Sequence, residues 1–170
     1  MTFLEASRRV VPHSGLLLAG FLLACGGRGG SLPEPPPCED LQGPEPATAE
    51  AYLDAVADGK GAVQRPAFEF LTRWPSRKYS RRQMFREELA SAADASICAA
   101  RRLRSLAPPM AAYAEYDAAL DDLLTQYEQD MAVGREAAAL RNVSKYREWL
   151  KAVDALPASL ALLDSDLPGE

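Results

Sequence analysis

The chain has a single histidine, His13, and no histidine follows it. Histidine is the side chain that most often serves as a general acid or base near neutral pH, and it is the commonest metal ligand. The sequence also lacks Ser-x-x-Lys, Gly-x-Ser-x-Gly, phosphate-loop and Glu-x-x-His patterns. We therefore expect no catalytic residue, no metal site and no cofactor, and we do not expect an enzyme.

Strand patterns and long apolar runs are scarce as well. No alternation of apolar and polar residues lasts more than a few positions, which argues against a sheet. The one apolar run, residues 15–24, is shorter than the ~20 residues that a membrane-spanning helix needs. Beyond a Gly/Pro-rich segment, alanine and charged residues recur at helical spacing, so the sequence predicts an all-α fold.

The apolar run is preceded by two arginines and followed by Cys25, which is the order of a secretory signal. Residues 22–25 read Leu-Leu-Ala-Cys and resemble the lipobox of bacterial lipoproteins. The resemblance covers about 28 residues. It implies cleavage before Cys25, diacylation of the Cys25 thiol and attachment to a membrane by the lipid. In Gram-negative sorting, Gly26 in place of aspartate implies the outer membrane, at its periplasmic or cell-surface face.

Two other interpretations of this run stay open: an ordinary signal peptide cleaved elsewhere, and an uncleaved membrane anchor. The Gly-rich residues 26–31 favour the lipoprotein, because lipidated proteins typically carry a flexible leash. The expected organisation is a signal peptide over 1–24, a Gly/Pro-rich tether over 25–45 and one helical domain over 46–170. Loss of the signal takes the formal net charge from −5 to −6, which argues against nucleic acid as a partner.

The chain has three cysteines. If Cys25 carries lipid, Cys38 and Cys98 remain, and two cysteines in an oxidising compartment most often form a disulfide. Two free thiols are the alternative. The entropy of closing a loop of about 60 residues gives a stabilisation of about 4 kcal/mol. Because Cys98 lies half a turn from Leu89, the bridge would hold the N-terminal segment over the outer face of a helix.

In the first part of the domain the patterns predict two helical pieces. Thr48 can cap a helix over 49–58, and Gly59 suits the left-handed residue that ends one. A short element follows over 66–74 and stops at Pro75.

A second long helix is predicted from Ser80 to Leu106, with Ser80 and Gln83 as a capping box. Its inner stripe is formed by Phe85, Leu89, Ala93, Ser96, Ala100 and Leu103. A third helix begins near Pro109. Its apolar stripe is Tyr113, Tyr116, Leu120, Leu123, Leu124, Tyr127 and Met131.

The end of the third helix is left open by the sequence. Either it continues past residue 150, or a break falls near Gly134 or Asn142. The last segment, 146–156, is predicted to end at Pro157.

Charge predicts how the second and third helices pack. Residues 73–104 hold nine Lys+Arg and three acids, whereas residues 113–130 hold six acids and no base. A tight connection at 107–109 would fold one helix back on the other, so that opposite charges line neighbouring helices. Because such surface pairs contribute only about 0–1 kcal/mol each, they would select the arrangement more than stabilise it.

The most unusual patch is a basic aromatic segment over 73–82. Its candidate residues for binding an anion or a partner are Arg73, Trp74, Arg77, Lys78, Tyr79, Arg81 and Arg82. Outside the cytoplasm the matching anions are lipid head groups, lipopolysaccharide, peptidoglycan or an acidic protein surface. The alternative is a loop whose charges pair with the acidic third helix.

These patterns together predict an all-α bundle of about four helices behind a lipidated tether. The expected role is non-catalytic: a membrane-tethered module that binds another envelope protein, as in an assembly or helper function. In architecture alone it resembles the pilotins, small helical lipoproteins that escort secretin subunits to the outer membrane. The alternative is an envelope module that binds anionic cell-wall or lipopolysaccharide ligands through residues 73–82.

Overall fold

A computed structural model describes residues 32, 37–38, 45–76, 78, 81–165 and 167. In this part of the chain there are four α-helices and no strand, which confirms the predicted all-α fold. The helices are α1 (Ala49–Arg73), α2 (Gln83–Arg104), α3 (Ala114–Leu140) and α4 (Val143–Asp164), and a 3₁₀ turn, η2 (Ala111–Tyr113), precedes α3. The predicted signal peptide, Cys25 and most of the tether lie outside the described residues.

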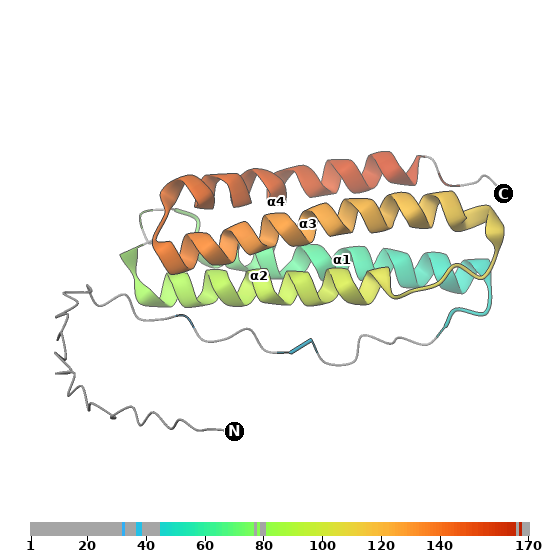
Figure 1. The fold of residues 1–170 in the computed structure, drawn as a ribbon, viewed down its shortest axis with the longest axis horizontal. Helices are drawn as coiled ribbons and strands as arrows, with labels where there is room; N and C mark the ends of the chain where they lie inside the picture. Colours follow the sequence, from blue (N-terminus) through green and yellow to red (C-terminus); the bar gives the residue numbers. More distant parts are fainter. Residues whose placement is uncertain are drawn as a thin grey trace, which may run out of the picture.

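The four helices run side by side in an up-down-up-down order (Figure 1). α2 packs against both α1 and α3, and α4 packs on α3, whereas α1 and α4 touch less extensively. The α1–α2 and α3–α4 connections lie at the same end of the bundle, on the left in Figure 1. We call it the double-turn end, because α2 and α4 both begin there.

α1 is one continuous helix, so the predicted end at Gly59 and the separate element over 66–74 are wrong. Thr48 does cap it: its hydroxyl accepts a hydrogen bond from the Ala51 N–H at 3.2 Å. Gly59 serves close packing instead, because a Cβ there would lie 2.7 Å from a methyl of Leu103 on α2. Gly59 and Pro66 both disfavour a helix, but tertiary packing of the buried face outweighs this tendency, and the face keeps its helical spacing through both residues. It comprises Tyr52, Val56, Val63, Ala67 and Phe70.

α2 begins at Gln83 rather than at Ser80, and Ser80 lies outside the described residues. Arg82 stands at the N-cap, so Gln83 is the first helical residue and not the third, which is out of register with the predicted capping box; its side-chain amide donates to the Glu87 carboxylate at 2.7 Å. All six residues of the predicted inner stripe are buried, which confirms the helical period. Because α2 lies between two helices, its buried face is wider than that stripe and also contains Arg86, Ala90, Ala92 and Asp94.

α3 does not continue past residue 150, because a break falls at Arg141 and Asn142, the second of the two positions that the sequence left open. Arg141 takes a left-handed conformation, with φ of 53°, and ends α3. The Asn142 side chain then caps α4 by accepting from the Ser144 N–H at 2.9 Å and the Lys145 N–H at 3.2 Å. α4 continues through Pro157, so the predicted end there is wrong. α3 also starts later than predicted, after η2 rather than at Pro109.

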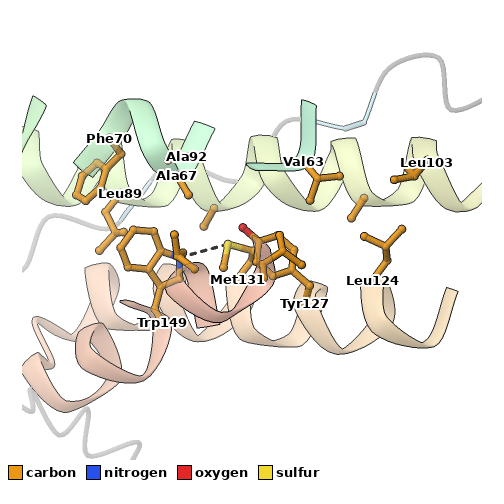
Figure 2. Close-up of a cluster of buried hydrophobic side chains, with 14 of the residues drawn as sticks. Val63, Ala67, Phe70, Leu89, Ala92, Leu103, Leu124, Tyr127, Met131 and Trp149 are labelled. Carbon is orange, nitrogen blue, oxygen red and sulfur yellow. Dashed lines mark hydrogen bonds between the residues drawn. The ribbon is translucent and has the colours of Figure 1, made fainter. Parts of the chain in front are cut away.

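Aromatic side chains join all four helices towards the double-turn end. Trp149 of α4 is fully buried, and Figure 2 shows its indole beside Phe70 and Met131. The rings of Phe70 and Trp149 are 5.6 Å apart, and the indole N–H donates to the Met131 sulfur at 3.3 Å. Phe70 in turn contacts Phe85 of α2, with ring centroids 5.0 Å apart. Edge contacts of this kind add about 0.5–1.5 kcal/mol each beyond simple burial.

Ion pairs between α2 and α3 confirm the predicted charge complementarity. Arg101 pairs with Glu128 at 2.8 Å, and Arg104 pairs with Asp121 at 2.7 Å and with Glu128 at 2.8 Å. One pair has the opposite polarity, since Arg135 of α3 binds Asp94 of α2. Because the arginines of the Arg101 and Arg104 pairs are partly exposed, these pairs act mainly on which helices become neighbours and in which register they pack.

The fit of Trp149 against Gly134 gives the first prediction. A Cβ on residue 134 would overlap the Trp149 ring, and this ring is held on all sides. We expect Gly134→Ala to lower the free energy of unfolding by about 1–3 kcal/mol, as overpacking of a core does. Urea denaturation followed by tryptophan fluorescence measures the change.

Gly61→Ala is the matched control. Gly61 also lies within a helix, but a Cβ there meets nothing within 4 Å. We expect this variant to gain up to about 1 kcal/mol from helix propensity. Equal stability of the two variants would contradict the packing described for Trp149.

Candidate functional site

The disulfide between Cys38 and Cys98 is present, with 5.2 Å between the two Cα atoms, and confirms the predicted pair. It joins residues that are 60 positions apart in the chain. Cys98 is half-buried and lies half a turn round α2 from the fully buried Leu89. The bridge therefore ties the N-terminal segment to α2 beside the bundle and leaves the core undisturbed.

The basic aromatic segment begins inside the fold. Trp74 is only 8% exposed, and its indole N–H donates to a Glu88 carboxylate oxygen at 2.8 Å. The guanidinium of Arg73 binds the other oxygen of Glu88 at 3.2 Å. The Trp74 ring also packs on Phe85, with centroids 5.7 Å apart. These two candidate residues thus hold the end of α1 to the start of α2, and the acid that receives them lies on α2 rather than on α3.

The remaining described residues of the segment lie at the surface. Lys78, Arg81 and Arg82 are exposed, and the Lys78 backbone N–H donates to the Ser76 hydroxyl at 3.3 Å. Arg77 and Tyr79, the other candidates, lie outside the described residues. The structure therefore places three of the predicted cations at the surface, next to the start of α2.

The tyrosines along α3 belong to the core. The Tyr116 hydroxyl donates to Asp164 at 3.1 Å, and Tyr52 of α1 donates to Asp117 at 2.8 Å. Burial, and then the hydrogen bond to Asp117, raise the pKa of Tyr52 above its usual value. Burial and the nearby Asp164 charge do the same for the pKa of Tyr116, and burial raises the pKa of Tyr127 to about 12. These hydroxyls stay protonated near neutral pH, and those of Tyr52 and Tyr116 link neighbouring helices.

A residue that the sequence analysis missed is Arg86. It follows Phe85 on α2 and is only 4% exposed. Its Nε and Nη1 atoms are buried and have no hydrogen-bond partner among the described residues. It lines a narrow cavity at the double-turn end with Phe85, Leu89, Ala137, Ala138, Arg141, Asn142, Val143 and Tyr146. The sequence signal for its burial is the set of alanines that follows it on α2. Small side chains on two faces of a helix indicate that neighbouring helices pack on both faces.

Other kinds of site find little support in the residues that the structure describes. Within them, no cluster of three or more His, Cys, Asp or Glu side chains has the arrangement of a metal site. None of the four helices combines the length and the hydropathy needed to cross a bilayer. No protein-family model, curated protein or solved structure matches the chain. Function is therefore inferred from the residues of this chain.

The buried Tyr127 hydroxyl gives a pH-dependent prediction. In the unfolded chain a tyrosine ionises near pH 10, whereas Tyr127 in the fold keeps its proton to about pH 12. Below pH 10 the tyrosine is neutral in both states, so stability does not depend on its ionisation and is fully present. As the pH rises from 10 to 12, the fold must keep Tyr127 protonated while the unfolded chain ionises, and stability falls by an amount on the order of 2 kcal/mol.

Tyr127→Phe isolates this contribution. The Tyr127 hydroxyl oxygen is buried without a hydrogen-bond partner in the described part of the chain, so its removal should leave stability at pH 7 unchanged or raised. Between pH 10 and 12 the variant should lose less stability than the wild type in urea denaturation. The same alkaline loss in both proteins would refute the assignment.

Proposed function

We propose that this protein is a lipid-tethered, non-catalytic helical module of the bacterial cell envelope that binds another envelope protein. The Cys38–Cys98 bridge is the observation that supports it best. Structural disulfides are typical of compartments outside the cytoplasm, which agrees with a secretory signal. The bridge also uses two of the three cysteines and leaves Cys25, the residue that a lipobox would modify.

The position of the bridge sets the reach of the proposed tether. Residues 26–37 separate Cys25 from Cys38, and an extended chain spans about 3 Å per residue. The bundle would then stay within roughly 40 Å of the membrane that holds the lipid. A compact bundle held by a short tether is suited to binding another protein at the same membrane, as an assembly factor or pilotin-like helper does.

Binding of cell-wall or lipopolysaccharide anions through residues 73–82 is the second candidate. Lys78, Arg81 and Arg82 support it, because they are exposed next to one another in sequence. Burial takes Trp74 out of such a surface, and the exposed Arg73 is already paired with Glu88. Protein binding is therefore the function that we favour.

Removal of the lipid site tests the proposal. We expect wild-type protein to fractionate with membranes and to capture one specific envelope protein after cross-linking in intact cells. A variant in which residues 1–25 are replaced by an ordinary cleavable signal peptide should leave the membrane fraction and lose this partner, because no lipid then holds the bundle nearby. Detection of the Cys38–Cys98 bridge by mass spectrometry shows that the variant still folds. Equal membrane fractionation of the two proteins would contradict the proposal.

Charge reversal separates the two candidates. Lys78→Glu combined with Arg81→Glu changes two exposed cations and leaves the Arg73–Glu88–Trp74 contacts in place. If protein binding is correct, this variant keeps its partner and shows no altered sedimentation with purified peptidoglycan or lipopolysaccharide. If wild type sediments with these polymers and the variant does not, the second candidate replaces the first.

A further inference from the structure

The double-turn end exposes several large apolar side chains. Met84 is 60% exposed, Leu140 is 62% exposed and Val143 is 41% exposed. They belong to the start of α2, the end of α3 and the start of α4, three element ends that meet at this end of the bundle (Figure 1). Val143 itself lines the narrow cavity beside Arg86, and the other two lie next in sequence to cavity-lining residues. The cavity and these exposed apolar side chains therefore lie at the same end of the bundle.

Arg86 places a positive charge within this surface. Its guanidinium is a positive charge with five N–H donors and no acceptor. Burying a charge without a partner is costly, yet Arg86 is 96% buried and two of its nitrogen atoms lack hydrogen-bond partners among the described residues. Asp94, the other buried charged residue of α2, is by contrast paired with Arg135. Arg86 thus requires an acceptor that the described residues do not supply.

The acids in the neighbouring turns are already engaged. Glu87 accepts from Gln83, and Glu88 accepts from Arg73 and Trp74. On α3, Glu136 binds Lys145 at 2.6 Å. Within the described residues, no carboxylate is left for Arg86 in these turns. A partner acid from outside the chain would meet the requirement.

The cavity itself favours a negatively charged atom. Val143 is the first residue of α4, and a helix N-terminus of this length carries a partial positive charge. The cavity has a volume of about 10 Å³, which is room for one oxygen atom rather than for a whole phosphate group. A carboxylate can insert one oxygen while its carbon chain remains outside. The exposed Met84, Leu140 and Val143 would then meet apolar neighbours of that carboxylate.

We infer that the double-turn end is a docking surface for a protein segment in which a carboxylate, flanked by apolar residues, pairs with Arg86. The charge-assisted hydrogen bonds to the guanidinium give orientation, and the exposed apolar side chains exclude water around them. Met84 adds an adaptable contact, because an unbranched side chain can follow the shape of its partner. This inference rests on the proposed function as a protein-binding module and names the chemistry of its partner.

The experiment uses N-acetylleucine, a carboxylate with one apolar side chain, and its neutral analogue N-acetylleucinamide. Intact protein purified from its membrane in detergent is titrated with each, and ¹H–¹⁵N spectra follow the Arg86 Nε–H and the Val143 amide. We expect saturable shifts of both signals with N-acetylleucine, and none with N-acetylleucinamide. Arg86→Met should weaken the affinity at least tenfold while keeping the fold, since methionine fills similar space without a charge.

Arg65→Met is the matched control, because Arg65 is an exposed arginine on α1 that lies outside both the cavity and the basic aromatic segment. It should bind N-acetylleucine like the wild type. Equal shifts with the two ligands, or a response that survives Arg86→Met, would overturn the inference. An equal saturable response to chloride would also overturn it, because the cavity would then be a simple anion site. In that case the wild-type protein can still capture a membrane partner. A failure of this inference is therefore distinguishable from a failure of the proposed function.

Discussion

The contact between Trp149 and Gly134 is the constraint on which the double-turn end depends. Because Gly134 has no side chain, the indole of α4 lies directly against α3 and is fully buried there. From this position it contacts Phe70 of α1, and Phe70 contacts Phe85 of α2. The starts of α2 and α4 are thereby held together, which brings Arg86 and Val143 to one cavity. The candidate docking surface is a consequence of how this core packs.

α2 connects the core with the proposed tether. It packs on α1 and α3, it carries most of the interhelical ion pairs, and its Cys98 holds Cys38. The tether would therefore join the bundle at the side of α2, whereas the cavity beside Arg86 lies at the start of the same helix. The proposed tether and the candidate docking surface would thus use separate parts of α2. A lipid-bound module could in this way stay near its membrane and still present a free end to a partner.

The sequence predicted those features that depend on local pattern and pairwise chemistry. The inner stripe of α2, the Thr48 cap, the Cys38–Cys98 pair and the opposite charges on α2 and α3 are all observed. The errors arose where tertiary packing outweighs a local signal. α1 continues through Gly59, where Leu103 of α2 packs against the glycine. α4 likewise continues through Pro157. Arg86 was missed for the same reason, since its burial depends on neighbours on both sides of α2.

The proposed lipid anchor links the sequence evidence with the proposed role, and the mass of the mature protein tests it most directly. The protein is purified from envelopes without reduction, and its intact mass and N-terminal peptide are measured. The account predicts a chain that begins at Cys25, carries a diacylglyceryl group on that thiol and retains one disulfide between Cys38 and Cys98. An unlipidated chain, or one that still contains residues 1–24, would contradict it.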